Sequence, residues 1–133
     1  MKSPSEVLRA FMAEMNAWEL RCISRRKDRE AGTLTYADSK RMGIEEYQEI
    51  FLRHCSPAAK PREYFFTEPP EYDPVGEEIT QELEIRPGVF EIQAQQNYSH
   101  KSRHIYLLKL EDSEWKLLSK HILIGDKKMK TGL

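Results

Sequence analysis

Four stretches in the second half of the chain alternate between apolar and polar residues, and this pattern constrains the fold more than any other feature. The predicted strands cover residues 79–85, 89–96, 103–110 and 115–124. A period of two with one apolar side indicates a sheet with one buried face and one solvated face. The short polar breaks between these stretches predict tight turns, so we expect an antiparallel meander.

Two helices are predicted ahead of the sheet. Ser3 and Glu6 have the spacing of a capping box, and Pro4 suits the first helical position. An apolar stripe then recurs at helical spacing, at Val7, Leu8, Phe11, Met15, Trp18 and Cys22. The second helix is expected over residues 36–54, with Gly43 weakening or breaking its middle. Helices followed by a meander predict an α+β fold in which the helices cover the apolar face of the sheet.

The helices are expected to pack on the sheet through their largest apolar groups. Phe11 and Trp18 should therefore contact Phe90, Ile92 and Trp115. The connector over residues 57–76 holds five prolines and four aromatic residues, which indicates an ordered loop docked on the core. The whole chain, 1–133, is expected to form one domain.

Composition argues against several classes of protein. No apolar run approaches the roughly 18–20 residues of a membrane span, and the N-terminus lacks the apolar stretch of a signal peptide, so we expect a cytoplasmic protein without membrane contact. Cys22 and Cys55 have no metal-ligand spacing and are interpreted as reduced, buried thiols. Because phosphate-loop, metal and nucleophile motifs are also missing, no cofactor or metal is expected.

The charge is unevenly distributed. The net charge of −1 favours neither nucleic-acid nor membrane binding, but residues 68–91 carry −7, which leaves +6 on the rest. Within the acidic stretch, the spacing places Glu82, Glu84 and Glu91 together on the solvated face of two neighbouring strands. A basic cluster lies at the end of the first helix and consists of Arg25, Arg26, Lys27 and Arg29. It is interpreted as a solvated helix terminus, with a phosphate or nucleic-acid site as the alternative.

Strand alternation also predicts a set of inward polar groups. If Lys116 and Lys120 mark the solvated side of the last strand, then Trp115 and His121 point inward, as His104 and Tyr106 do on the strand before. These four side chains are candidates to line a cavity, where histidine and tyrosine can serve acid–base chemistry on a small molecule. The alternative is that they are core residues with satisfied polar tips, or pocket residues that take part in no reaction. No inward carboxylate is expected beside them.

Apolar residues also fall on the nominally solvated side of the last strand, at Leu118, Ile122 and Ile124. Such residues suggest that this part of the sheet is covered. A partner protein, a second copy of the chain or the terminal segment 125–133 are the candidate covers.

Several segments together resemble one protein family. They are 11–19 and 47–51 on the helices, the run Pro69-Pro70-Glu71-Tyr72-Asp73-Pro74, Gln95-Gln96, and the strand from Arg103 to Leu108 that leads to Trp115. The chain resembles the immunity proteins with a nuclear transport factor 2-like fold from bacterial polymorphic toxin systems. The six-residue proline run is the most specific part of the likeness. Ser113 departs from it, because a glycine is usual in that turn.

The resemblance implies a cystatin-like cone, in which a curved antiparallel sheet wraps around the N-terminal helices. It implies a stoichiometric inhibitor of a cognate toxin rather than a catalyst. A basic nuclease is the expected partner of the acidic stretch, with candidate contacts at Glu71, Tyr72, Asp73, Glu82, Glu84 and Glu91. A homodimer through the outer sheet face is a further candidate assembly. The same fold hosts isomerases and polyketide cyclases, so the alternatives are a small-molecule enzyme or ligand binder of the ketosteroid isomerase type and an accessory scaffold.

Overall fold

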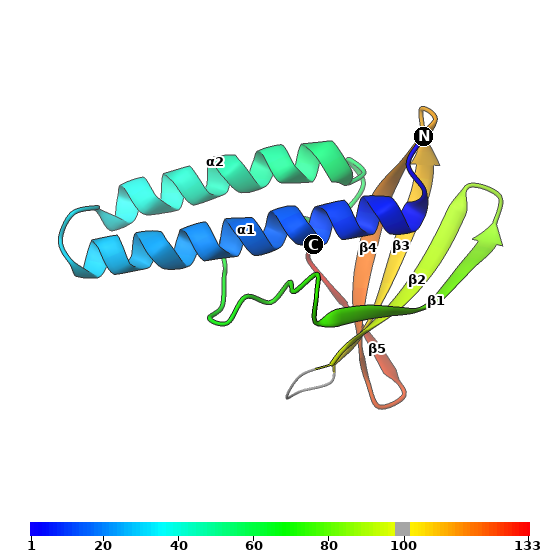
Figure 1. Ribbon diagram of the computed structural model, residues 1–133. Coiled ribbons are helices and arrows are strands. Elements are labelled where there is room, and N and C mark those ends of the chain that lie inside the picture. The colour runs from blue at the N-terminus through cyan, green and yellow to red at the C-terminus, as the bar shows by residue number, and fades with distance from the viewer. Residues whose placement is uncertain (98–101) are drawn as a thin grey trace.

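The computed structural model describes residues 1–97 and 102–133 and places two helices against one face of a curved, five-stranded antiparallel sheet (Figure 1). The helices α1 (Pro4–Glu30) and α2 (Tyr36–His54) lie side by side and run in opposite directions. The strands follow in chain order: β1 (Glu77–Arg86), β2 (Val89–Gln96), β3 (Arg103–Glu111), β4 (Glu114–Ile124) and β5 (Lys127–Thr131). The predicted α+β architecture is confirmed.

The helix boundaries follow from local signals in the sequence. Ser3 caps α1 and exchanges both hydrogen bonds of the capping box with Glu6. Thr35 caps α2 through its hydroxyl, which accepts from the amide of Asp38. Gly43 does not break α2, contrary to our expectation. Instead, a Cβ at this position would lie 2.5 Å from a ring carbon of Tyr64, so glycine is needed there for the close approach of the connector.

The core lies between α1 and the concave face of the sheet, where Phe11 and Ile92 belong to one buried cluster with Phe90 and Trp115 packed against it. Trp18 belongs to the same cluster but packs between the helices and the connector, beside the rings of Tyr47 and Tyr64. The expected contact of Trp18 with the sheet is thus replaced by one with the connector. The reason is geometric: the helix pair extends well beyond the sheet (Figure 1).

A fifth strand was missed by the sequence analysis. The segment 125–133, one of the three candidate covers for the sheet, turns at Gly125 and pairs with β4 in antiparallel register. It therefore extends the sheet at its edge rather than covering a face. The chain then returns to the core, where Leu133 is fully buried and its carbonyl accepts from the hydroxyl of Tyr47.

Candidate functional site

The proline run that marks the family resemblance packs onto the core through Tyr72. Tyr72 is fully buried, with its ring 4.2 Å from the ammonium of Lys120 and 5.3 Å from the guanidinium of Arg62. Glu71 accepts from the same two cations, at 3.0 Å from Lys120 and 2.8 Å from Arg62. Glu71 and Tyr72 of the run, together with Arg62 and Lys120, thus form a part-buried ionic clamp that ties the connector to β4.

A second carboxylate, on α1, completes the attachment of the connector. Glu19 is fully buried and accepts from the backbone amides of Glu71 and Tyr72, at 2.8 Å and 3.2 Å. Burial raises the pKa of Glu19, and these hydrogen bonds oppose that rise. Sequence reasoning missed Glu19, although it lies four residues after Met15 and three before Cys22, on the apolar stripe of α1.

Lys120 is inside because of a bulge in β4. Leu107 pairs with Ser119 and Leu108 with Leu117, so Leu118 is an extra residue. Because side chains alternate between the two faces, every residue of β4 after Leu118 lies on the face opposite to the one predicted. The prediction that Lys120 points to solvent is therefore wrong. His121, expected inward, pairs with Ile105 on the convex face instead, and Ile122 faces the concave side opposite His104.

A compact polar cluster lies on the concave face of the neighbouring strands. Nδ1 of His104 lies 2.7 Å from Oε1 of Glu77, and the hydroxyl of Tyr106 donates to the same oxygen at 3.4 Å. All three side chains are buried, and burial raises the pKa of Tyr106 well above its ordinary value. The inward positions predicted for His104 and Tyr106 are confirmed. The expectation of no inward carboxylate is wrong, because β1 begins two residues before the predicted strand and includes Glu77.

Trp115, the fourth cavity candidate, is half-buried and packs edge-to-face against Phe90 with ring centroids 5.8 Å apart. The space beneath α1 is filled by side chains, since Ile92, Tyr106, Leu108 and Leu117 are all fully buried. A more open apolar groove of about 510 Å³ lies elsewhere, between α2 and the connector, with Tyr47, Phe51 and Tyr64 in its walls. Among the described residues, no group of three or more His, Cys, Asp or Glu side chains is arranged to hold a metal ion.

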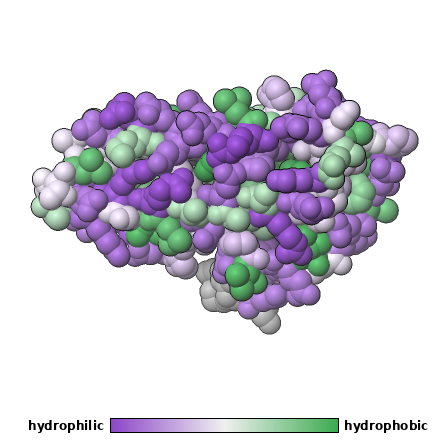
Figure 2. Space-filling model, turned by 45° about the horizontal axis from the view of Figure 1, so that its top comes forward, coloured by the Kyte–Doolittle hydropathy of each residue, from purple (hydrophilic) through white to green (hydrophobic). Residues whose placement is uncertain are grey.

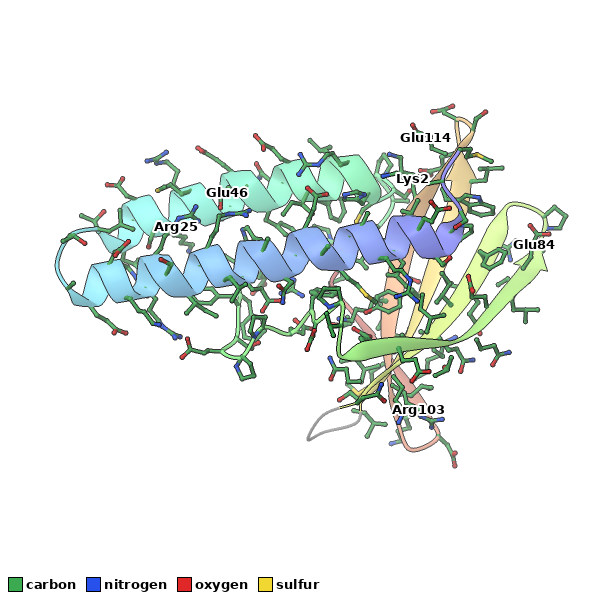
Figure 3. All side chains as sticks on the ribbon, in the orientation of Figure 1. Lys2, Arg25, Glu46, Glu84, Arg103 and Glu114 are labelled. Carbon is green, nitrogen blue, oxygen red and sulfur yellow. The ribbon has the colours of Figure 1, made fainter. Side chains whose placement is uncertain are left out.

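The three arginines of the basic cluster at the end of α1 contact other parts of the protein. Arg25 lies 2.6 Å from Glu46 of α2, and Figure 3 shows the two side chains facing each other between the helices. Arg26 pairs with Glu68 of the connector at 3.2 Å, and the guanidinium of Arg29 lies 5.0 Å from the ring centre of Tyr36. These contacts explain the cluster as a junction between α1, α2 and the connector.

The acidic stretch divides into internal and surface groups. Glu71 and Glu77 are used in the core, and Asp73 accepts from the amides of Val75 and Gly76. Glu82 and Glu84 are exposed and Glu91 is half-buried, and no described residue forms an ion pair with any of the three.

The three surface acids do not share one face, contrary to the sequence prediction. Thr80 is an extra residue in β1, so Glu82 and Glu84 pair with Ile92 and Phe90 on the concave side. Glu91 lies on the convex side with Leu83. The concave and convex faces meet at the outer edge of β1. Figure 3 shows Glu84 at the end of the β1–β2 arm, far from α2.

A helix pair seated on the concave face of a curved antiparallel meander places this chain in the nuclear transport factor 2-like class of α+β folds. Residues 3–132 match the model of the family described as NTF2 fold immunity protein, and the chain belongs to that family. It is also similar to immunity protein RhsIA of Dickeya dadantii (strain 3937), with 27% identity over 121 residues, 88% of this chain and 84% of the relative. No solved structure matches the chain with significance. The predicted family is confirmed.

The ionic clamp predicts how stability changes in acid. Burial alone would raise the pKa of Glu71, but the neighbouring Lys120 and Arg62 outweigh it and lower the pKa from 4.5 to about 2. A depressed pKa stabilises the fold above pH 4.5, and this contribution is lost as pH falls from 4.5 to 2. We expect a loss of up to about 3 kcal/mol from Glu71 over that window. Urea unfolding at several pH values measures it.

The matched variant for this measurement is Glu71→Gln, which cannot titrate at this position. Its unfolding free energy should be lower than wild type at pH 7 and should fall less between pH 4.5 and 2. If the unfolding free energies of the two proteins fell equally between pH 4.5 and 2, titration of Glu71 would not be the cause of the acid destabilisation.

Proposed function

We propose that this protein binds a cognate bacterial toxin and inhibits it stoichiometrically, without catalysing a reaction. Membership of the immunity family supports the neutralising role. The observation that favours binding over catalysis is the packing of the concave face. His104 and Tyr106, which an enzyme of this fold would present to substrate, are sealed in the core with Glu77. The groups left for recognition are those on the surface.

The toxin that fits this surface best is a nuclease. Surfaces that bind nucleic acid are rich in Lys and Arg because they neutralise phosphates. The acids on the outer part of β1 and β2 complement such a surface and speed its capture. The face of the molecule seen in Figure 2 is largely hydrophilic with small hydrophobic patches, consistent with a polar interface.

The remaining parts of the proposal follow from the sequence. The chain 1–133 acts as one domain in the cytoplasm, without cofactor or nucleic-acid partner. Within the described residues, neither helix combines the length and the apolar character needed to cross a membrane. A homodimer through the outer sheet face remains an additional proposal, tested by the sedimentation of the purified protein.

The decisive experiment titrates toxin activity. The gene directly upstream is expressed as the candidate toxin, and its activity is measured after incubation with increasing amounts of the immunity protein. An inhibitor reaches full effect at a fixed molar ratio and gains nothing from longer incubation. Loss of toxin activity at a small fraction of that ratio, growing with time, would instead indicate catalysis.

A set of variants at the predicted cavity residues separates the binder from the alternative of a ketosteroid isomerase-type enzyme or ligand binder. His104→Ala, Tyr106→Phe and His121→Ala should preserve protection of cells that express the toxin, apart from losses of stability. The reason is that His104 and Tyr106 are buried and His121 lies on the other face of the sheet. Survival on toxin induction measures the effect, with thermal unfolding as the control. A folded His104→Ala protein that protects no cells would favour the enzyme.

A further inference from the structure

The outer half of β1 is an uncovered border of the sheet. Among the strands of residues 1–97 and 102–133, β1 is first in the sheet order and pairs only with β2. Its residues from Thr80 to Arg86 are all exposed, including Leu83 at 48% and Ile85 at 43%. Figure 1 shows the β1–β2 arm extending away from the helices. The free side of such a strand presents backbone N–H and C=O groups that a further strand can pair with.

The two edge strands of the sheet differ in how well they are protected against pairing with a further strand. The opposite border, β5, has five residues, three of which are lysines, and short, lysine-rich edge strands discourage pairing. β1 has ten residues and carries neither lysine nor proline. Its bulges at Thr80 and near Ile85 leave a regular segment from Gln81 to Glu84. That segment is long enough for a short strand to pair with.

The charges on β1 determine which kind of strand can pair with its free edge. If two copies paired antiparallel about Leu83, each Glu82 would lie opposite a Glu84, and like charges directly opposite each other destabilise a strand pair. A second copy of this chain is therefore a poor occupant. A strand with Lys or Arg opposite Glu82 and Glu84 gains two favourable cross-strand pairs, and an apolar residue beside Leu83 covers its exposed side chain.

We propose that the toxin binds by adding a short antiparallel strand to the free edge of β1 between Gln81 and Glu84. The incoming strand carries basic side chains on the concave side and an apolar side chain on the convex side. This inference rests on the proposed function for the identity of the partner. It adds the mode of binding, which is backbone pairing along an edge strand, with side-chain charge selecting the partner.

Hydrogen–deuterium exchange tests the backbone pairing directly. The purified product of the upstream gene is added to the wild-type protein at saturation, and exchange is compared with the free protein. Peptides covering residues 80–86 should slow by at least about tenfold, because edge amides that were open to water become hydrogen-bonded. Peptides covering β5 should be unchanged.

Charge reversal tests the selection of the partner. Glu82→Lys/Glu84→Lys should lower the association rate constant on the order of tenfold at low salt, with a smaller effect at higher salt. The control is Glu45→Lys/Glu49→Lys on α2, which changes net charge equally at another exposed site and should associate faster than the β1 variant.

The outcomes distinguish this inference from the function on which it rests. If the wild-type protein does not bind the upstream product, the proposed function fails for that partner. If it binds with unchanged exchange at residues 80–86, strand addition is overturned while the inhibitory function stands. An association rate in the β1 variant equal to that of the α2 control likewise overturns the charge selection.

Discussion

Replacing Trp18 with alanine should lower the free energy of unfolding by roughly 3–5 kcal/mol. The side chain is fully buried, and its indole N–H donates to the carbonyl of Gly43 at 2.9 Å. Its ring contacts Tyr47 of α2 and Tyr64 of the connector, so the truncation leaves a cavity where three segments meet. Urea unfolding monitored by far-ultraviolet circular dichroism measures the loss.

Leu20 provides the control on the same helix. Its side chain is 52% exposed, so Leu20→Ala should cost much less than Trp18→Ala. A Trp18→Ala protein with an unchanged unfolding midpoint would show that the helices and the connector do not meet around this ring.

Removal of Lys120 should produce a loss of similar size. Lys120→Ala leaves the part-buried Glu71 with one of its two cations gone and removes a fully buried ammonium, and breaking an ion pair of this kind costs up to about 3–5 kcal/mol. Burial alone would lower the pKa of Lys120, but Tyr72 and Glu71 outweigh it and raise the pKa, so the ammonium stays charged in the fold. Urea unfolding at pH 7 is again the measurement.

Two further variants separate charge from packing at this position. Lys120→Met keeps most of the side-chain volume and should lose less than Lys120→Ala. Combining Lys120→Met with Glu71→Gln should cost less than the sum of the two single changes, since partners in a shared ion pair are not additive. Lys109→Ala, on the exposed side of β3, serves as the control and should be nearly neutral. Strict additivity of the pair would contradict the clamp.

The fold was largely predictable because its signals are local. Capping residues set the starts of both helices, and alternation located the first four strands within two residues of their observed ends. β5 could not be found in this way. Its sequence, Lys-Lys-Met-Lys-Thr, shows no apolar side, because an edge strand gains its stability from backbone pairing with β4.

The candidate site was less predictable, because two single-residue bulges change which side chains share a face. Ahead of Leu118, the alternation places Trp115 and Leu117 correctly on the concave side; beyond it, the assignments of Lys120 and His121 are reversed. Thr80 has the same effect on Glu82 and Glu84. A bulge is decided by pairing between strands, so one strand's sequence does not reveal it. The proline run was assigned to the partner surface because acidic and aromatic residues suit a surface contact. They suit the ionic clamp equally well.

The uncovered outer half of β1 has a consequence for how such a protein diversifies. Residues 80–86 make no contribution to the buried core, so substitutions there are nearly neutral for folding, within about 0.5 kcal/mol each. The clamp and the capped helices hold the rest of the chain independently of this segment. If the toxin pairs with this strand as proposed, these positions can change one at a time in response to an altered toxin while the fold stays stable, and new specificities need not pass through unstable intermediates.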